Sequence, residues 1–417
     1  MSKSTPKISA AEPAPESKTT FHAVRQKRNM APEFNAYTRT GQEWLAFGSN
    51  DLYPQQTVKL LNSATHNAII NTKASMAYGG GPAFQAIDAM AQDALNAACG
   101  GDCEPLLRRL LRDIVIHNGF ALRVRYSMDY ARIASLEYVD FKTIRIESPA
   151  NNEDLMPHNC YISPDWAIIT PNAKAYGPAQ AVKEPLFNLK ARGPEEPTQI
   201  LYAIVPSDQT DYYPAPDYLG VINWALTEIE IANYHHKNVA NSFRPDIILS
   251  MPDMMSEDDK EAFLATITDQ YTGTDNAGGM IVLYAPLTPD TQGGASIAYP
   301  QITAMPNSAN ADLYLVTLTQ ATQQIITGHR LTSPAIAGLA GAGGLGGNAS
   351  EIATSFEYFY NTVVRDYVRR LNDLLWPVLK FMGFQNTIDF KTPLPFDAKE
   401  ALPNAEPMAP QLSNVRI

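Results

Sequence analysis

The chain has 417 residues, of which 45% are hydrophobic, so it is long enough for several domains and a substantial core. Its 43 acidic residues outnumber 32 basic ones, and the resulting charge of −11 excludes a uniformly basic nucleic-acid-binding protein. Three cysteines, Cys99, Cys103 and Cys160, are too sparse for a disulfide scaffold and fit a reducing compartment. The first 20 residues contain no apolar run, so no signal peptide is expected.

The N-terminal stretch differs in charge from the remainder of the chain. Residues 1–30 contain six basic and two acidic residues, a local charge of +4. The prolines Pro6, Pro13 and Pro15 and the scarcity of apolar residues predict a basic, flexible arm over 1–39. Two interpretations remain open: a solubilising tail, or a segment that contacts another component.

Residues 40–215 are predicted to form one α+β domain. We expect a helix near Pro54 to Tyr78, which the run of glycines at 79–81 should end, and a second helix from Pro105 to His117. Alternating side chains after Gly119 predict a strand over 121–126. Further strands are expected around 131–139, 142–147 and 200–205.

The segment 216–243 is predicted to form a long helix. Apolar positions recur three or four residues apart and predict one buried face, made of Ile222, Leu226, Ile229, Ala232, His236, Val239 and Phe243. His235 and His236 are adjacent and therefore point about 100° apart on a helix. This spacing favours a partly buried packing histidine beside a surface histidine over a metal site.

Residues 244–308 are predicted to combine two strands, over 246–250 and 280–284, with a short acidic helix over 256–271. Eight acidic residues and one basic residue give residues 251–300 a charge of −7. This block is either a solvated surface or a surface that binds a partner. The candidate docking residues are Glu257, Asp258, Asp259, Glu261 and Asp269.

A second helix is expected over 311–327, within the segment 309–330. It is unusual because no charged residue occurs from Leu313 to His329. One face carries Leu315, Leu318, Thr322, Ile325 and Ile326, and the opposite face carries Thr317, Gln320, Gln324 and Thr327. Because water-facing helices normally carry charges, the polar face indicates packing against another copy, a lining past which something slides, or helix packing within a large domain.

Residues 331–347 are rich in glycine and alanine and contain no charge. Residues 341–346 match the G-x-G-x-x-G pattern, but a dinucleotide site needs a preceding strand, and helices are expected on both sides here. The segment is either a flexible connector or a mobile loop that contacts a partner. A last helix should begin at Asn348, within the segment 348–392, and Pro377 is predicted to kink or end it. The tail, 393–417, is rich in proline.

No catalytic constellation stands out in the sequence. Cys99 and Cys103 lack a second pair at zinc-ligand spacing. We therefore predict no enzymatic activity, no metal and no cofactor. Residues 331–350 have the length of a membrane span, but six glycines and Pro334 make them a poor helix, so no membrane partner is expected.

The order of these elements resembles the portal proteins of tailed bacteriophages. The resemblance covers residues 45–395, and several local motifs accompany it. They are Tyr213-x-Ala215-Pro216, Asn241-x-x-x-Pro245, Gly273-x-x-Asn276-Ala277-Gly278, Ser333-Pro334-x-Ile336-x-Gly338 and, in the first half, Ser49-Asn50-Asp51-Leu52-Tyr53-Pro54 and His66-Asn67-Ala68-Ile69-Ile70. Ser242 departs from the pattern, which has glycine there.

The resemblance implies an elongated portal fold. Residues 40–215 would form the wing, which the last helix and a strand near Ile388 to Phe390 would complete. Residues 216–243 and 309–330 would be the stem helices, with Thr317, Gln320, Gln324 and Thr327 lining a channel. Residues 244–308 would be the clip. Residues 331–347 would be the tunnel loop, and its expected channel residues are Ala337, Gly338, Ala340, Gly341, Gly343, Gly344, Leu345, Gly346, Gly347 and Asn348.

The resemblance also implies partners and a location. Portal proteins form rings, typically dodecamers, at one capsid vertex of a virion that is assembled in the bacterial host cytoplasm. The expected partners are copies of the same chain, the terminase large subunit, a head–tail adaptor, the major capsid protein, scaffold and double-stranded DNA. Two alternatives stay open: an enzyme or anion-binding protein that uses the Gly-rich loop, and another ring-forming head–tail connector.

Overall fold

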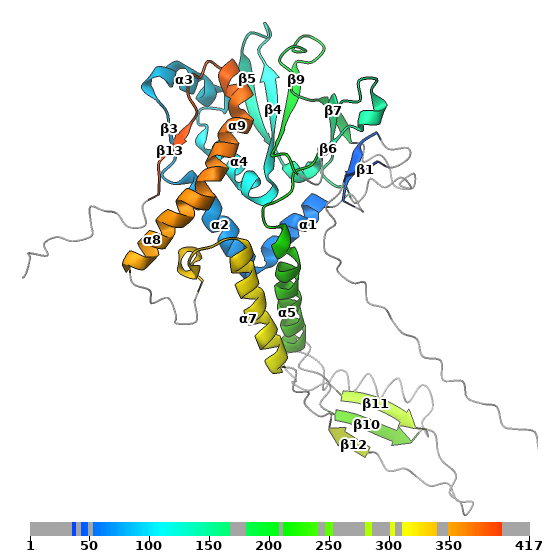
Figure 1. Cartoon of the computed structure of the whole chain (residues 1–417). Helices are drawn as coiled ribbons and strands as arrows, with labels where there is room; N and C mark the ends of the chain where they lie inside the picture. The colour runs from blue at the N-terminus through cyan, green and yellow to red at the C-terminus, as the bar shows by residue number, and fades with distance from the viewer. Residues whose placement is uncertain are drawn as a thin grey trace, which may run out of the picture. The chain divides into compact units, whose positions relative to one another are not determined.

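The computed structural model describes residues 36–38, 43–48, 53–166, 181–207, 212–240, 247–252, 280–285, 301–304, 311–339 and 349–393. Helices and strands are mixed along these residues, which confirms the α+β class (Figure 1). The expected acidic helix over 256–271, with Glu257, Asp258, Asp259, Glu261 and Asp269, lies outside the described residues, as do residues 340–348.

The predicted helix over 54–78 is in fact interrupted. It consists of α1 (Tyr53–Lys59), a 3₁₀ turn (Leu60–Asn62) and α2 (Ala64–Tyr78). Ser63 has an extended backbone, and its hydroxyl accepts a hydrogen bond from the His66 N–H, as an N-cap does. α2 ends before Gly79, as expected. This residue has a φ of 53°, and a Cβ there would lie 2.0 Å from the Lys391 carbonyl oxygen, so the position requires glycine.

Two further helices, α3 (Ala89–Ala98) and α4 (Glu104–His117), pack near a three-stranded antiparallel sheet. The sheet order is β5 (Ile133–Val139), β4 (Gly119–Tyr126) and β9 (Thr198–Ile204). The sequence pattern did not predict α3. Asn118, with a φ of 59°, lets the chain turn from α4 directly into β4.

A second sheet is formed by the chain between β5 and β9. Its strands are β6 (Ile144–Ile146), β7 (Asn159–Ile162) and β8 (Val182–Pro185). The expected strand over 142–147 is shorter, because Phe141–Thr143 form a 3₁₀ turn capped by the Asp140 side chain. Two short pairs complete this part: β1 (Ala36–Thr38) with β2 (Leu45–Phe47), and β3 (Pro82–Ala83) with β13 (Asp389–Phe390).

The segment between the two long helices contains a sheet of its own. β10 (Ile247–Pro252) pairs in parallel with β11 (Met280–Ala285) and antiparallel with β12 (Gln301–Ala304). The first two strands were predicted, and the third was not.

The long helices are α5 (Ile222–Ala240) and α7 (Ala311–Gly328). After a 3₁₀ turn (Pro334–Ala337), one continuous helix runs through α8 (Ala349–Phe359), a π-helical segment (Tyr360–Val364) and α9 (Arg365–Phe381). Pro377, which was predicted to kink or end this helix, lies inside α9 and does not end it. Its neighbours Val378 and Leu379 are fully buried, and this packing offsets the hydrogen bond that proline cannot donate.

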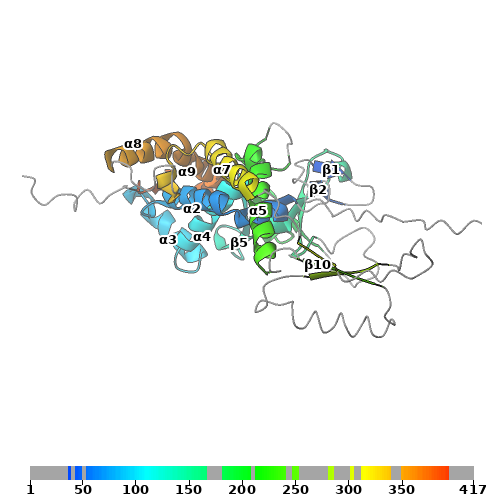
Figure 2. The same ribbon diagram turned by 90° about the horizontal axis from the view of Figure 1, so that it is seen from below.

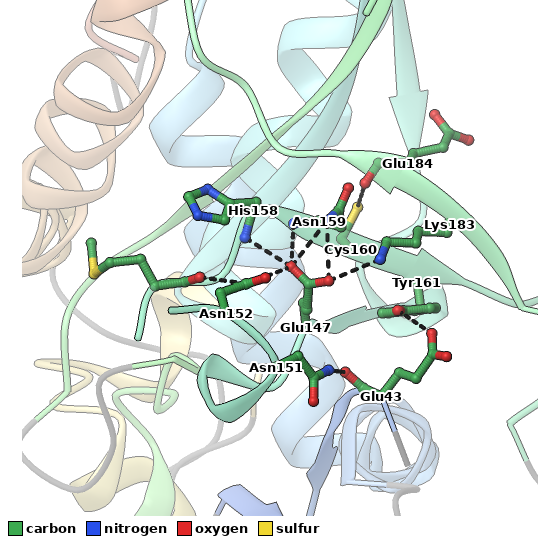
Figure 3. A network of polar contacts seen from close by, with 11 residues as sticks. Glu43, Glu147, Asn151, Asn152, His158, Asn159, Cys160, Tyr161, Lys183 and Glu184 are labelled. Atoms are coloured by element: carbon green, nitrogen blue, oxygen red, sulfur yellow. Dashed lines mark hydrogen bonds and ion pairs between the residues drawn. The ribbon is translucent and has the colours of Figure 1, made fainter. Parts of the chain in front are cut away.

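One buried carboxylate organises the second sheet (Figure 3). Glu147, 2% exposed, accepts hydrogen bonds from the Asn152 side chain, from the backbone N–H of His158 and of Asn159, and from the Lys183 ammonium, at 2.9 to 3.0 Å. Burial by itself raises the pKa of Glu147, but these donors outweigh it and lower the pKa to about 2.

Glu147→Gln should therefore destabilise the protein at neutral pH by about 3 kcal/mol. The stabilisation by the carboxylate is complete above pH 4.5 and is lost as pH falls toward 2, because the folded pKa lies below the unfolded one. Urea unfolding at several pH values measures this. The difference between wild type and variant should shrink on acidification, and a constant difference would contradict the assignment.

Candidate functional site

The paired helices α5 and α7 form the most unusual surface of the described chain (Figure 1). Ala321 and Ile325 of α7 are fully buried, and the rings of Tyr234 in α5 and Tyr314 in α7 lie 4.7 Å apart. The end of α7 approaches the 3₁₀ turn before α5 (Leu219–Val221) so closely that a Cβ on Gly328 would lie 2.3 Å from a methyl group of Val221. The glycine therefore sets the distance at which the pair packs.

The outer face of α7 carries no charge in its described part. Gln320, Gln324 and Thr327, which were predicted to face a channel, are exposed, and Thr317 is half-buried. Leu315 was predicted on the apolar packing face, but it is 64% exposed, as is Val316. Among the residues that the structure describes, α7 packs mainly against α5, and its apolar stripe is left exposed at Leu315.

The expected buried face of α5 is also only partly confirmed. Ile222 is buried, but Ala232 and His236 are exposed. His235 is exposed too, beside the rings of Tyr234 and Tyr314 at 5.7 and 6.1 Å, so the predicted packing histidine is wrong for the single chain. The described buried residues of α5 all lie in its first half, which includes Ala225 and Ile231.

The start of α5 and the end of α7, which we call the root of the two helices, contact buried polar side chains that were not predicted from the sequence. Glu228 of α5 is 7% exposed, and its carboxylate accepts hydrogen bonds from the hydroxyls of Ser63 and Thr65. The Thr65 N–H also donates to it, at 3.3 Å. Glu228 thus satisfies free donors at the start of α2 and fixes α5 against it.

A second chain of contacts joins α2, α9 and the end of α7. His66 Nδ1 lies 2.9 Å from His329 Nε2, and the Lys73 ammonium lies 3.2 Å from His329 Nδ1 and 3.4 Å from the Tyr367 hydroxyl. The first three side chains are at most 2% exposed. We call His66, Lys73 and His329 the root triad.

The geometry of the root triad fixes the imidazole tautomers. A lysine side chain with its ammonium can only donate, so His329 Nδ1 accepts and its Nε2 carries the hydrogen. That N–H donates to His66 Nδ1, and the hydrogen of His66 is left on Nε2. A further proton on either ring would place two donors face to face, so both histidines are neutral in the intact triad.

The pKa values of the root triad agree with this arrangement. Burial, and then the charge of Lys73, lower the pKa of His66 to about 4. Burial also lowers the pKa of His329 far below its ordinary value, with the charges of Lys73 and His66 adding to the effect. Burial lowers the pKa of Lys73 to about 8, although the charge of Asp217 opposes the shift.

Acidification should therefore loosen the root of the paired helices. Because the unfolded chain binds more protons than the folded one between pH 6.5 and 4, the free energy of unfolding falls over this window, by about 3 kcal/mol for His66 alone. The protection of the amides of residues 222–231 and 321–329 against hydrogen exchange, measured relative to the intrinsic exchange rate at each pH, should fall over the same window.

The matched variant is His66→Asn with His329→Gln, which keeps amide groups at the two facing positions and removes both titrating rings. It should show a much weaker dependence of stability on pH between 6.5 and 4.5. An unchanged slope in this variant would show that the root triad does not set the acid sensitivity.

The predicted tunnel-loop residues are only partly described. Ala337 is half-buried in the 3₁₀ turn that follows α7, and Gly338 ends this turn with a φ of 68°. The turn contacts α2 and α8. The beginning of the segment, which was expected to be an irregular loop, therefore has regular structure and packs against two helices. Pro334 at the first turn position favours this form. Ala340, Gly341, Gly343, Gly344, Leu345, Gly346, Gly347 and Asn348 lie outside the described residues.

No helix in the described part of the chain combines the length and the hydropathy that a membrane span requires.

Comparisons with known proteins find no matching family model and no matching curated protein. Solved structures do match. A chain in the neck of a native gene transfer agent particle, computed with C12 symmetry, is 14% identical, with a TM-score of 0.46 over 84% of this chain and 86% of that chain. A chain in the neck of the empty particle is 13% identical, with a TM-score of 0.48 over 81% and 84%.

An HK97-family phage portal protein from Corynebacterium diphtheriae is a further match, 11% identical, with a TM-score of 0.39 over 80% of this chain and 94% of that chain. Because the sequences are only 11 to 14% identical, these matches describe a similar arrangement of helices and strands and nothing about function.

Proposed function

We propose that this chain is the portal protein of a tailed bacteriophage. It forms a ring at one capsid vertex of the virion, most simply a dodecamer, through which double-stranded DNA is packaged and later ejected. The observation that carries the proposal is the paired helix α7, whose exposed face is uncharged between residues 314 and 328. The order of elements around this pair, with a small sheet between the two helices, supports the same function.

The uncharged face has a physical use in a DNA channel. Each contact of a lysine or arginine with a phosphate adds salt-dependent affinity for the duplex. In a ring such contacts repeat in every copy, so even about 1 kcal/mol per contact would hold the DNA in place. Gln320, Gln324 and Thr327 offer no fixed charge, and they let a duplex of any sequence move past them.

The remaining segments receive roles in the same proposal. Residues 331–347 form the tunnel loop, which touches DNA sterically through backbone and small side chains such as Ala340 and Leu345. The acidic segment 244–308 docks the terminase large subunit and afterwards the head–tail adaptor. The basic arm 1–39 contacts the major capsid protein, scaffold or packaged DNA. The chain itself has no catalytic role.

Light scattering of the purified protein over a range of concentrations tests the assembly on which this function depends. We expect a closed oligomer of defined mass. A chain that stays monomeric at every concentration would overturn the proposal.

A further inference from the structure

Helix α4 carries a row of arginines on its outer face. Arg108, Arg109 and Arg112 are all exposed, and at 100° per residue they fall within a 100° arc of the helix. Figure 2 shows α4 beside α2, with which it packs. We call these three residues the arginine face.

Uncharged partners hold each guanidinium in place. The guanidinium of Arg108 lies 4.0 Å from the ring centroid of Tyr78, and that of Arg109 lies 5.4 Å from the ring centroid of Tyr138. Arg112 donates a hydrogen bond of 2.7 Å to the side-chain oxygen of Asn71. Among the residues that the structure describes, none of the three arginines forms an ion pair. Among the described residues each guanidinium is thus held by a neutral group and not by a carboxylate.

Of the two acidic residues of α4, Glu104 lies one turn before Arg108 and offsets part of its charge, whereas Asp113 is buried. The carboxylate of Glu104 accepts a hydrogen bond from the Tyr78 hydroxyl at 2.6 Å. Asp113 is buried against the Tyr138 hydroxyl, 2.9 Å away, and burial raises the pKa of Asp113 to about 8, so it is mostly protonated at neutral pH. The neighbouring helices α1 and α2 contain no acidic residue, and Lys59 at the end of α1 is exposed.

The chemistry of the face distinguishes between classes of partner. Protein interfaces rely on apolar or aromatic anchors at their centre. Neither α1, α2 nor α4 has a large exposed apolar side chain in the described chain. What the face presents is a set of planar donors from rigidly placed guanidiniums, together with the amide of Asn71, and these groups suit phosphate oxygens.

We propose that the arginine face binds the phosphate backbone of double-stranded nucleic acid without reading its sequence. The inference does not depend on the portal function, because it rests on α4 and its neighbours alone. Three phosphate contacts per chain predict that the logarithm of the binding constant falls with the logarithm of salt concentration with a slope of about −2.7. This corresponds to an affinity loss of about 40-fold between 50 and 200 mM salt.

The test is fluorescence anisotropy of a 30-base-pair duplex of arbitrary sequence, titrated with the full-length protein at several salt concentrations. The variant Arg108→Gln with Arg109→Gln and Arg112→Gln removes the face and keeps helix propensity. The control variant Arg132→Gln with Lys190→Gln and Lys380→Gln makes the same change in net charge at other exposed positions. Basic residues of the arm 1–39 contribute equally in all three proteins.

We expect the first variant to bind more weakly by at least tenfold at 100 mM salt, with a salt slope smaller by about 2.7, and the control to bind like wild type. If both variants lose the same affinity for the duplex, net charge alone explains the binding, and the arginine face is not a binding site. A competition assay compares poly-glutamate, heparin and unlabelled duplexes of other sequences at matched charge concentration. If poly-glutamate displaces the labelled duplex as well as heparin does, and the unlabelled duplexes compete no better, the partner is an acidic protein and the nucleic-acid assignment is wrong. Ring images of the same variants report on assembly separately.

Discussion

Changing Leu315 and Val316 to glutamate is expected to give a folded chain that no longer assembles. Both side chains are 64% exposed in the single chain, so its own fold does not need them. In a ring Leu315, on the apolar face, would be buried against a neighbouring copy, where an unpaired carboxylate costs several kcal/mol at every subunit interface. Val316 lies one turn before Gln320, at the border of the uncharged face. Because closure of a ring needs all interfaces at once, the expected result is monomer in light scattering with a normal melting temperature.

The matched control for this variant is Met90→Glu with Met128→Glu. These methionines are 87% and 98% exposed, and they lie outside α5 and α7. The control adds the same charge at apolar surface positions and should assemble like wild type. If the variant in α7 still assembles, the exposed apolar pair does not lie in a subunit interface.

Replacing Gln320 and Gln324 with lysine should slow or stop DNA packaging while leaving assembly intact. Both glutamines are exposed on the uncharged face of α7, where lysine is accommodated without repacking. Each new ammonium adds a phosphate contact worth about 1 kcal/mol, and a ring multiplies it by the number of copies. The amount of DNA per capsid measures the effect, which should weaken as salt is raised.

The variant Gln320→Glu with Gln324→Glu separates attraction from a general disturbance of the helix. Glutamate has a similar size and helix propensity but repels phosphate, so it should not trap the duplex. Packaging that is equally impaired in both variants, or in neither, would show that the charge-free face does not govern the movement of DNA.

The sequence predicted the long helices well, because their apolar periodicity and their ends are local properties. The expected helix over 311–327 is α7 (Ala311–Gly328), and the one from Pro105 to His117 is α4 (Glu104–His117). In both cases the pattern extends over several turns and outweighs single exceptions. The glycines at 79–81 ended α2 for the reason expected of them.

Elements whose position depends on distant residues were missed or wrong. β8 (Val182–Pro185) is largely exposed and polar, and it is a strand because it pairs with β7. Of the two effects predicted for Pro377, a kink or an end of the helix, the end does not occur, because packing of its neighbours outweighs a missing hydrogen bond. Leu315 followed the apolar pattern of α7, but its side chain is 64% exposed in the single chain.

The root triad illustrates the same limit for the candidate site. His66 and His329 are 263 positions apart, and no local pattern brings them together. The neighbouring contact of Glu228 did have a signal in the sequence. Glu228 lies between the buried positions Ala225 and Ile231 of α5, and a carboxylate on an apolar face requires a polar partner. This pattern predicts a buried polar contact, but it does not identify Ser63 and Thr65 as the partners.

Negative-stain electron microscopy of the purified full-length protein tests the central claim most directly. If the chain is a portal protein, class averages will show closed rings with a central hole and rotational symmetry, and the Leu315→Glu, Val316→Glu variant will not form them. Uniform single particles of monomer size, at concentrations where the protein is folded, would contradict the account.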